Sequence, residues 1–463
     1  MGHVGIFSTM TSELLSGAKR QGAAGARQLI LSTLLLVAGV GLLHFVCFRL
    51  VSKADIDPWG LSDFYPLSVF KFRTPNALQL LWAVAFEGTF VALFCKLTRK
   101  PVTLFWVFGA ALLFAVQSNL LHGWRYGIDY PTATSGDSGI EYYHDAIVIQ
   151  GPLWFLRRFN AVQFELLEHA RTHPPGPVLF YYVLHRALRN PGLISIAVTA
   201  VSLGLALPYW RRLLRLTLGE APTSVLLLYA ILPANLIYGL ATVDAPIAAL
   251  FLATVVSFVD EDRRGSWLIA AVWLSASLFF TFGALFLLPV LLGFELLQHR
   301  RVTRAALVVG LSALVLASLK PLFGYGWLSS FLRASAMENA KGFLLFADPK
   351  RYLWYRLGAV AEILCFFSPF LAWLLLRGVP VLKRESPRAW TLAWLAPLSL
   401  ALVLLSGAMK VGEAARICLF ILPYLLLPVV AAWRELRVAD QFRVAQAVFA
   451  WGLLMQLFGF YQW

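Results

Sequence analysis

Long apolar stretches separated by short charged turns run through almost the whole chain. Stretches long enough to cross a bilayer recur about thirteen times, since a membrane helix needs about 20 mostly apolar residues. Their approximate bounds are 29–50, 77–95, 102–121, 191–209, 222–243, 245–259, 266–281, 283–298, 305–321, 356–376, 389–408, 417–433 and 444–461. The pattern predicts an all-α, polytopic membrane helix bundle of about thirteen spans, within a range of about twelve to fourteen.

Two long polar loops interrupt this pattern and divide the chain into regions. We expect a cytoplasmic N-terminal segment (1–28), a three-helix region (29–121), an outer loop with an interfacial helix (122–177), central membrane helices (178–319), a second outer loop (320–356) and C-terminal membrane helices (357–463). Connecting turns in a bundle need only a few residues, so the long outer loops are where we look for chemistry.

The composition excludes a soluble enzyme and a disordered chain. Hydrophobic residues make up 59% of the 463 positions and charged residues only 14%, with a mean hydropathy of +0.72. Soluble domains carry roughly 25% charged residues. The net charge of +15 reflects basic turns between apolar stretches, so it predicts membrane sidedness and no nucleic-acid partner.

Basic residues predict how the chain lies in the membrane. Lys19, Arg20 and Arg27 precede the first apolar stretch, which predicts a cytoplasmic N-terminus. We expect the protein to lie in the cytoplasmic (inner) membrane. With alternating crossings, every later turn on the cytoplasmic side is short and basic, provided that Val178–Leu188 does not span the whole membrane. We interpret these residues as a re-entrant or tilted half-helix; a fourteenth span would invert all later loops.

The first outer loop combines ionisable residues with an amphipathic segment and a proline-rich helix start. Asp137, Glu141 and Asp145 lie in its first half, and Leu153–Ala170 repeats apolar residues at helical spacing, as expected of a helix in the interface plane. The run Thr172–Pro177 then opens an apolar helix. Prolines are tolerated at a helix start, and the positive end of the helix dipole favours a phosphate there.

Two further motifs follow this loop along the chain. Asp244 stands at the predicted outer end of a helix, two residues before Pro246, and Glu413 and Arg416 precede Pro423 near the C-terminal helices. With the acidic loop and His173-Pro-Pro, the ordered set resembles the GT-C glycosyltransferases. The branch it is most similar to comprises the dolichyl-phosphate-mannose protein mannosyltransferases and their bacterial relatives that use polyprenyl-phosphate sugars.

The resemblance implies a mannosyltransferase-like enzyme with a GT-C fold and an active site on the outer face. It would transfer a sugar from a polyprenyl-phosphate donor to a hydroxyl of a lipid, glycan or protein acceptor, with inversion at the anomeric carbon. The catalytic base would be Asp137, Asp145 or Glu141. Residues expected to bind substrate or phosphate are His173, Asp244, Glu413, Arg416, Lys410 and Arg333.

The sequence indicates no metal and no other cofactor. It has no His/Asp cluster at ligand spacing, and its four cysteines fall within or beside apolar stretches, without a disulfide or metal pattern. Arginine and lysine suffice to meet phosphate charge. Glu87 and Glu362 lie inside apolar stretches, where ionisable groups are costly, so each either lines a donor cavity or makes an interhelical hydrogen bond.

Other interpretations stay open at this point. The loop Ser52–Asn76 contains Asp55, Asp57 and Asp63 and is an alternative first loop, because the catalytic loop of the family usually follows the first membrane helix. A transporter or lipid flippase would also be polytopic, but internal repeats are not evident in this sequence. A polysaccharide polymerase or ligase would share the bundle and a large outer loop.

Overall fold

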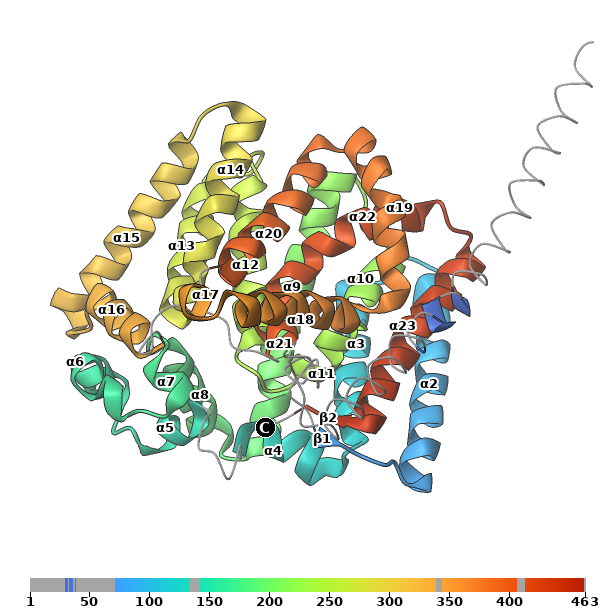
Figure 1. Cartoon of the computed structure of the whole chain (residues 1–463), viewed down its shortest axis with the longest axis horizontal. Helices are drawn as coiled ribbons and strands as arrows, with labels where there is room; N and C mark the ends of the chain where they lie inside the picture. Colours follow the sequence, from blue (N-terminus) through green and yellow to red (C-terminus); the bar gives the residue numbers. More distant parts are fainter. Residues whose placement is uncertain are drawn as a thin grey trace, which may run out of the picture.

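The structure is a computed structural model that describes residues 71–133, 142–338, 344–405 and 413–461, with residues 30, 31, 33–35 and 38 (Figure 1). The described chain is all-α apart from a two-residue ladder, in which β1 (Lys71–Phe72) pairs antiparallel with β2 (Gly459–Phe460). The ladder holds the segment before α2 against the C-terminal end of the described chain. Most of the predicted span 29–50 and most of the alternative loop Ser52–Asn76 lie outside the described residues.

Apolar helices form the bundle. In chain order they are α2 (Ala77–Thr98), α3 (Leu104–Leu120), α9 (Pro191–Leu218), α10 (Thr223–Ala230), α11 (Pro233–Tyr238), α12 (Asp244–Val259), α13 (Ser266–Phe280), η4 (Phe282–Leu287), α14 (Leu288–His299), α15 (Thr303–Phe323), α18 (Pro349–Phe367), α19 (Pro369–Glu385), α20 (Pro387–Leu405), α21 (Ala414–Ile417), η5 (Cys418–Ile421), α22 (Leu422–Arg434) and α23 (Val438–Phe458).

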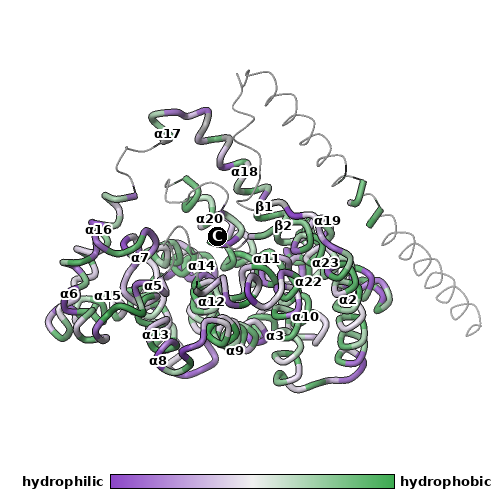
Figure 2. Tube along the Cα trace, turned by 90° about the horizontal axis from the view of Figure 1, so that it is seen from below, coloured by the Kyte–Doolittle hydropathy of each residue, from purple (hydrophilic) through white to green (hydrophobic). Residues whose placement is uncertain are grey.

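Among the described residues, six helical units are long and apolar enough to cross a membrane, or up to eight if each of two bent pairs counts as one span. They expose much of their apolar surface: only 17% of the most apolar window of α15 is buried, and 22% of that of α2. Figure 2 shows hydrophobic colouring along most bundle helices, with hydrophilic colouring at the turns. This is the architecture of a multi-pass membrane protein, and the count of about thirteen spans stays a prediction.

Two predicted spans are broken in the structure, so their interpretation as single helices was wrong. The stretch 222–243 divides into α10 and α11 at Ile231–Leu232, because Pro233 has no N–H to continue the helical hydrogen bonds. The stretch 356–376 breaks at Ser368, which has a φ of +97° just before Pro369, and the helices on either side meet at 97°. Neither break interrupts the apolar pattern.

Helix α12 is the centre of the bundle. All fifteen residues from Ala245 to Val259 are buried, and α9 and α13 pack along it. Its 16 residues make it about 24 Å long. Asp244 begins this helix and Asp260 caps its end, so the two aspartates mark opposite ends of the bundle.

The first long loop folds into short helices. They are η2 (Arg125–Asp129), α4 (Tyr130–Ala133), α5 (Tyr142–Val148), α6 (Pro152–Val162), η3 (Gln163–Glu165), α7 (Glu168–Arg171) and α8 (Gly176–Leu188). Figure 1 shows α4 to α8 along the lower edge of the bundle. The expected helix Leu153–Ala170 is divided among α6, η3 and α7, while α8 has the short length predicted for a half-helix. The second loop adds α16 (Trp327–Glu338) and α17 (Leu344–Ala347).

The turns expected on the cytoplasmic side contact one another. Arg212 pairs with Asp260, Arg388 with Glu261, and Arg434 donates to the carbonyl of Leu218. These contacts bring the turns after α9, α12, α19 and α22 to the same end of the bundle. Their common location is the arrangement that alternating crossings require.

Candidate functional site

Three predicted site residues meet at the start of α12. The Arg416 Nε lies 3.3 Å from Asp244 Oδ2, and Arg416 Nη2 donates to Glu413 Oε2 at 3.1 Å. The three side chains are only 11%, 19% and 10% exposed, in the order Arg416, Asp244, Glu413. The three side chains have lost most of their contact with water, so each depends on the others to compensate its charge. The arginine is therefore held in a fixed orientation between the two carboxylates.

The loop that presents Asp244 is strained. Ala241 adopts a φ of +66°, a conformation unusual for a residue with a Cβ, three residues before Asp244. Its carbonyl accepts a hydrogen bond from the Tyr181 hydroxyl of α8. Backbone strain of this kind persists where surrounding contacts impose it, and it is found most often at functional sites. Tyr181 thus ties the helix after His173 to the loop of Asp244.

A buried glutamate supports the segment that carries Glu413 and Arg416. Glu362 of α18 accepts hydrogen bonds from the backbone N–H groups of Ala414 and Ala415, at 3.1 and 3.2 Å, and it is fully buried. These N–H groups open α21 and have no partner within a helix. The carboxylate of Glu362 therefore fixes the start of α21 and, with it, the guanidinium of Arg416.

His173 lies close enough to Arg416 to feel its charge. Burial lowers the pKa of His173 to about 4, and the positive charge of Arg416 acts in the same direction. Its Nδ1 donates to the carbonyl of His169 at 2.9 Å, because a carbonyl can only accept. At neutral pH the ring is uncharged and Nε2 carries the lone pair, so His173 can accept a hydrogen bond from a hydroxyl group.

The start of α8 does not face open space. A Cβ on Gly176 would lie 2.3 Å from the carbonyl oxygen of Phe279, so only glycine allows this approach between α8 and the end of α13. The positive end of one helix dipole therefore meets the negative end of another. This contact competes with a phosphate at the start of α8, whereas Arg416 is a cation that lies within the cluster itself.

Asp145 occupies a neighbouring position in the loop helices. Its Oδ2 accepts from the N–H of Leu167 at 3.1 Å, and burial raises the pKa of the Asp145 carboxyl to about 6. In the same helix, the ring of Tyr142 contacts the ring of His173 edge-on at 5.6 Å. Helix α5 therefore packs against the His173 segment, but in the described chain no ion pair or hydrogen bond joins Asp145 to Arg416.

The other predicted site residues are placed differently. Arg333 lies over the ring of Phe164 at 5.7 Å, and no contact joins it to Asp244 in the described chain. Asp137, Glu141 and Lys410 lie outside the described residues. Sequence reasoning did not predict the roles of Glu362, Tyr181 and Ala241; only Glu362 gave a signal, as a carboxylate within an apolar stretch.

The chemistry open to this site follows from its donor set. Within the described ranges, no group of three or more histidine, cysteine, aspartate or glutamate side chains is placed to hold a metal ion. The cluster instead offers one cation, two carboxylates and a neutral imidazole, which suit proton transfer and the binding of an anion beside a hydroxyl. Comparisons with protein-family models and with curated proteins find no match to this chain.

Proposed function

We propose that the protein is an integral membrane glycosyltransferase of the GT-C type. It transfers a sugar from a polyprenyl-phosphate donor to an acceptor hydroxyl on the extracytoplasmic face, with inversion. The observation that carries this proposal is the contact of Arg416 with Asp244 and Glu413 beside His173, at one end of an apolar bundle. The motifs that supply these residues are far apart in the sequence.

The proposed reaction needs a base and a cation. The acceptor oxygen attacks the anomeric carbon, the bond from that carbon to the phosphate oxygen breaks, and a carboxylate takes the hydroxyl proton. Asp244 and Glu413 are the described carboxylates beside Arg416, and Asp137, Asp145 and Glu141 are the loop candidates. Arg416 stabilises the phosphate that leaves, since a guanidinium has five N–H donors in a planar fork.

The proposed substrates match the apolar bundle and the polar cluster at one end of it. The exposed apolar faces of α2 and α15 are surfaces on which a polyprenyl chain can lie within the bilayer. The neutral His173 offers an acceptor nitrogen for a sugar or acceptor hydroxyl. The proposed partners are therefore a polyprenyl-phosphate sugar and a lipid, glycan or protein acceptor, with no cofactor required.

The test is transfer by purified protein from a panel of radiolabelled polyprenyl-phosphate sugars to membrane-extracted acceptors. We expect one donor to be used, and Asp244→Asn to lower the rate by about 10²–10⁴-fold, the scale of general base catalysis. Glu165→Gln is the matched control, because it also removes a carboxylate but lies exposed in η3. Equal rates in the two variants, or translocation of lipid without sugar transfer, would contradict the proposal.

A further inference from the structure

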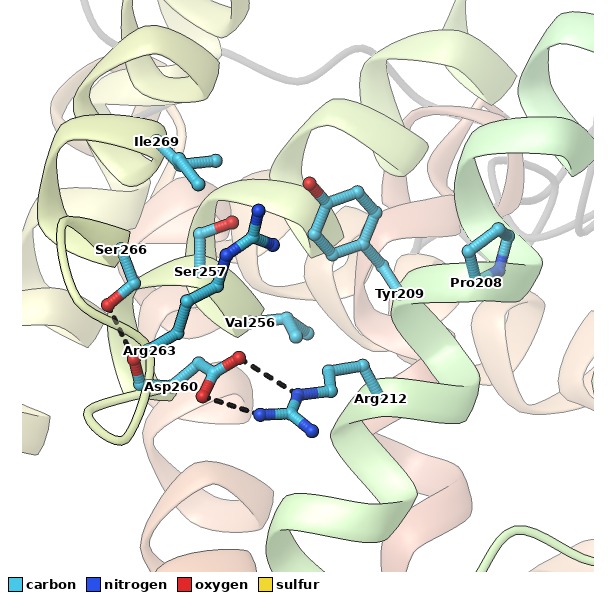
Figure 3. Close-up of a pocket in the computed structure, with 9 residues that line it drawn as sticks. All are labelled: Pro208, Tyr209, Arg212, Val256, Ser257, Asp260, Arg263, Ser266 and Ile269. Atoms are coloured by element: carbon cyan, nitrogen blue, oxygen red, sulfur yellow. Dashed lines mark hydrogen bonds and ion pairs between the residues drawn. The ribbon is translucent and has the colours of Figure 1, made fainter.

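A second polar site lies at the other end of α12. A pocket of about 450 Å³ opens between the second half of α9, the end of α12 and the start of α13. Its polar lining comprises Tyr209, Arg212, Ser257, Asp260, Arg263 and Ser266 (Figure 3). The pocket and the Asp244–Arg416 cluster are separated by the length of α12, about 24 Å, so they are distinct sites.

The pocket has more positive charge than its own residues neutralise. Arg212 donates to both carboxylate oxygens of Asp260, each at 2.8 Å. The negative charge of Asp260, the acidic residue that lines the pocket, is therefore neutralised by Arg212. Figure 3 shows the Arg263 side chain extending from the α12–α13 turn into the pocket. In the described chain, the Arg263 side chain makes no hydrogen bond or ion pair. A guanidinium in a concave site without a counter-ion favours an anion.

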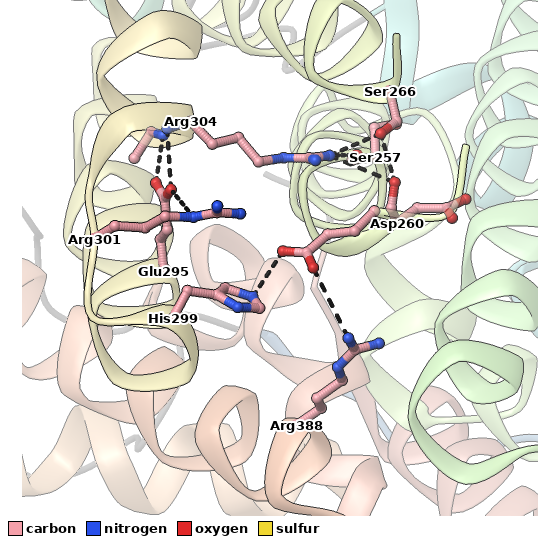
Figure 4. A network of polar contacts seen from close by, with 10 residues as sticks. Ser257, Asp260, Ser266, Glu295, His299, Arg301, Arg304 and Arg388 are labelled. Carbon is pink, nitrogen blue, oxygen red and sulfur yellow. Dashed lines mark hydrogen bonds and ion pairs between the residues drawn. The ribbon is translucent and has the colours of Figure 1, made fainter. Parts of the chain in front are cut away.

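The wall behind Arg263 is held rigid by a second arginine. Arg304 Nη2 donates to the Ser266 hydroxyl at 2.7 Å and to the carbonyls of Ser257 and Asp260 at 3.3 and 3.4 Å (Figure 4). This adds a positive charge directly behind the pocket. Three residues of the wall therefore keep their positions before any ligand binds, which lowers the entropy cost of binding.

The other acids of this region already have partners or lie outside the pocket. Glu261 faces His299 at 2.7 Å and Arg388 at 3.9 Å. Glu295 accepts from the backbone N–H groups of Arg304 and Ala305. Asp262 is exposed and does not line the pocket. The excess positive charge at Arg263 therefore stays uncompensated within the described chain.

The pocket continues into an apolar surface. Ile269 of α13 lines it, and the neighbouring Leu268 and Val272 are 45% and 62% exposed. On a membrane helix, exposed leucine and valine face lipid. A ligand that bridges the basic floor and this surface needs a negative head and an apolar tail, and basic pockets between membrane helices bind such head groups.

We propose that this pocket binds the phosphate-bearing head group of an anionic phospholipid. Arg263 meets the phosphate, the Ser257 and Ser266 wall fixes its position, and the acyl chains follow α13 into the bilayer. The pocket adds a lipid-binding site to the proposed transferase, and its occupation does not depend on sugar transfer.

The experiment measures lipid-dependent thermal unfolding of the full chain purified in detergent. Phosphatidylglycerol is titrated against phosphatidylcholine, with inorganic phosphate as a third series. A ligand that binds only the folded state raises the unfolding temperature with its concentration. We expect stabilisation by phosphatidylglycerol alone, with native mass spectrometry counting the retained lipid.

Two neighbouring arginines provide a matched pair of variants. Arg263→Gln should raise the half-maximal phosphatidylglycerol concentration about tenfold, the loss of one charged hydrogen bond. Arg264→Gln removes the same charge from an exposed residue that does not line the pocket, so it should behave as the wild type. Both should unfold at the wild-type temperature in phosphatidylcholine, because neither side chain makes a polar contact in the described chain.

Three outcomes would overturn the proposal. Equal weakening in Arg263→Gln and Arg264→Gln would mean that general surface charge attracts the lipid. Equal stabilisation by phosphatidylcholine would mean that charge has no part. Inorganic phosphate that stabilises as well as the lipid would assign the pocket to a free phosphate.

Discussion

Replacing Arg416 by lysine tests whether this cation acts by its geometry. The guanidinium reaches two carboxylates through different nitrogens, with Nε 3.3 Å from Asp244 and Nη2 3.1 Å from Glu413. Lysine offers one nitrogen on a flexible stem, so it can hold one carboxylate at the arginine geometry and not both. It also lacks the planar fork that meets a phosphate with two hydrogen bonds.

The expected magnitude follows from the lost contact. A hydrogen bond to a charged group contributes about 1.5–3 kcal/mol, which is about ten- to hundredfold in a rate or binding constant. Arg416→Lys should therefore lower kcat/KM for the donor by about ten- to hundredfold, while the chain still folds. If Arg416 only anchors its helix at the membrane surface, lysine should serve nearly as well.

Donor titration of purified variants in nanodiscs separates these outcomes. Arg377→Lys is the matched control, because Arg377 is 52% exposed and forms a surface pair with Glu435 at 3.7 Å. Such pairs contribute little, so this variant should keep wild-type kinetics. Unchanged donor kinetics in Arg416→Lys would refute the phosphate-binding role and transfer it to Lys410 or Arg333.

Three further predictions address stability and topology. Asp145→Asn should raise the free energy of unfolding at pH 7 by about 1–2 kcal/mol, as measured by chemical denaturation, after allowance for solvent screening of a partly exposed group. Because burial raises the pKa of Asp145 to about 6, the wild type should lose stability as pH rises from about 4 to 6, and the variant should not. Glu362→Gln should lower the unfolding temperature and transfer activity together, since an amide accepts only one of the two N–H groups at α21; an unchanged unfolding temperature would contradict its role as a support. Single cysteines at Glu165 and Arg264 should react with an impermeant maleimide from opposite sides of the membrane, and labelling of both from one side would contradict the predicted crossings.

The sequence predicts the helices well where apolar patterning alone decides them. Helices α2, α9, α12, α13 and α15 begin within a few residues of the predicted bounds, because charged turns punctuate the apolar runs. The breaks at Ile231–Leu232 and at Ser368 are not visible in hydropathy. Each depends on a proline whose effect in a membrane helix is decided by the neighbouring helices.

The candidate site was predicted in part for a similar reason. Asp244 and Arg416 stand at the ends of apolar stretches, so charge sidedness alone places them on one face, and their contact fits that expectation. The support from Glu362 depends on α18 turning across the bundle, which no local pattern encodes. The φ of Ala241 likewise results from tertiary contacts, since alanine has no preference for it.

The burial of α12 has a consequence for how the protein enters the membrane during synthesis. Its length of about 24 Å is below the roughly 30 Å of a bilayer core, and every residue from Ala245 to Val259 is covered by protein. Helix α13 is also short, with 15 residues, and follows after a tight turn. We therefore expect the two to insert as one helical hairpin, with the surrounding helices closing around α12 afterwards. Co-translational assembly, and not the hydropathy of the isolated segment, would then decide whether α12 reaches its place.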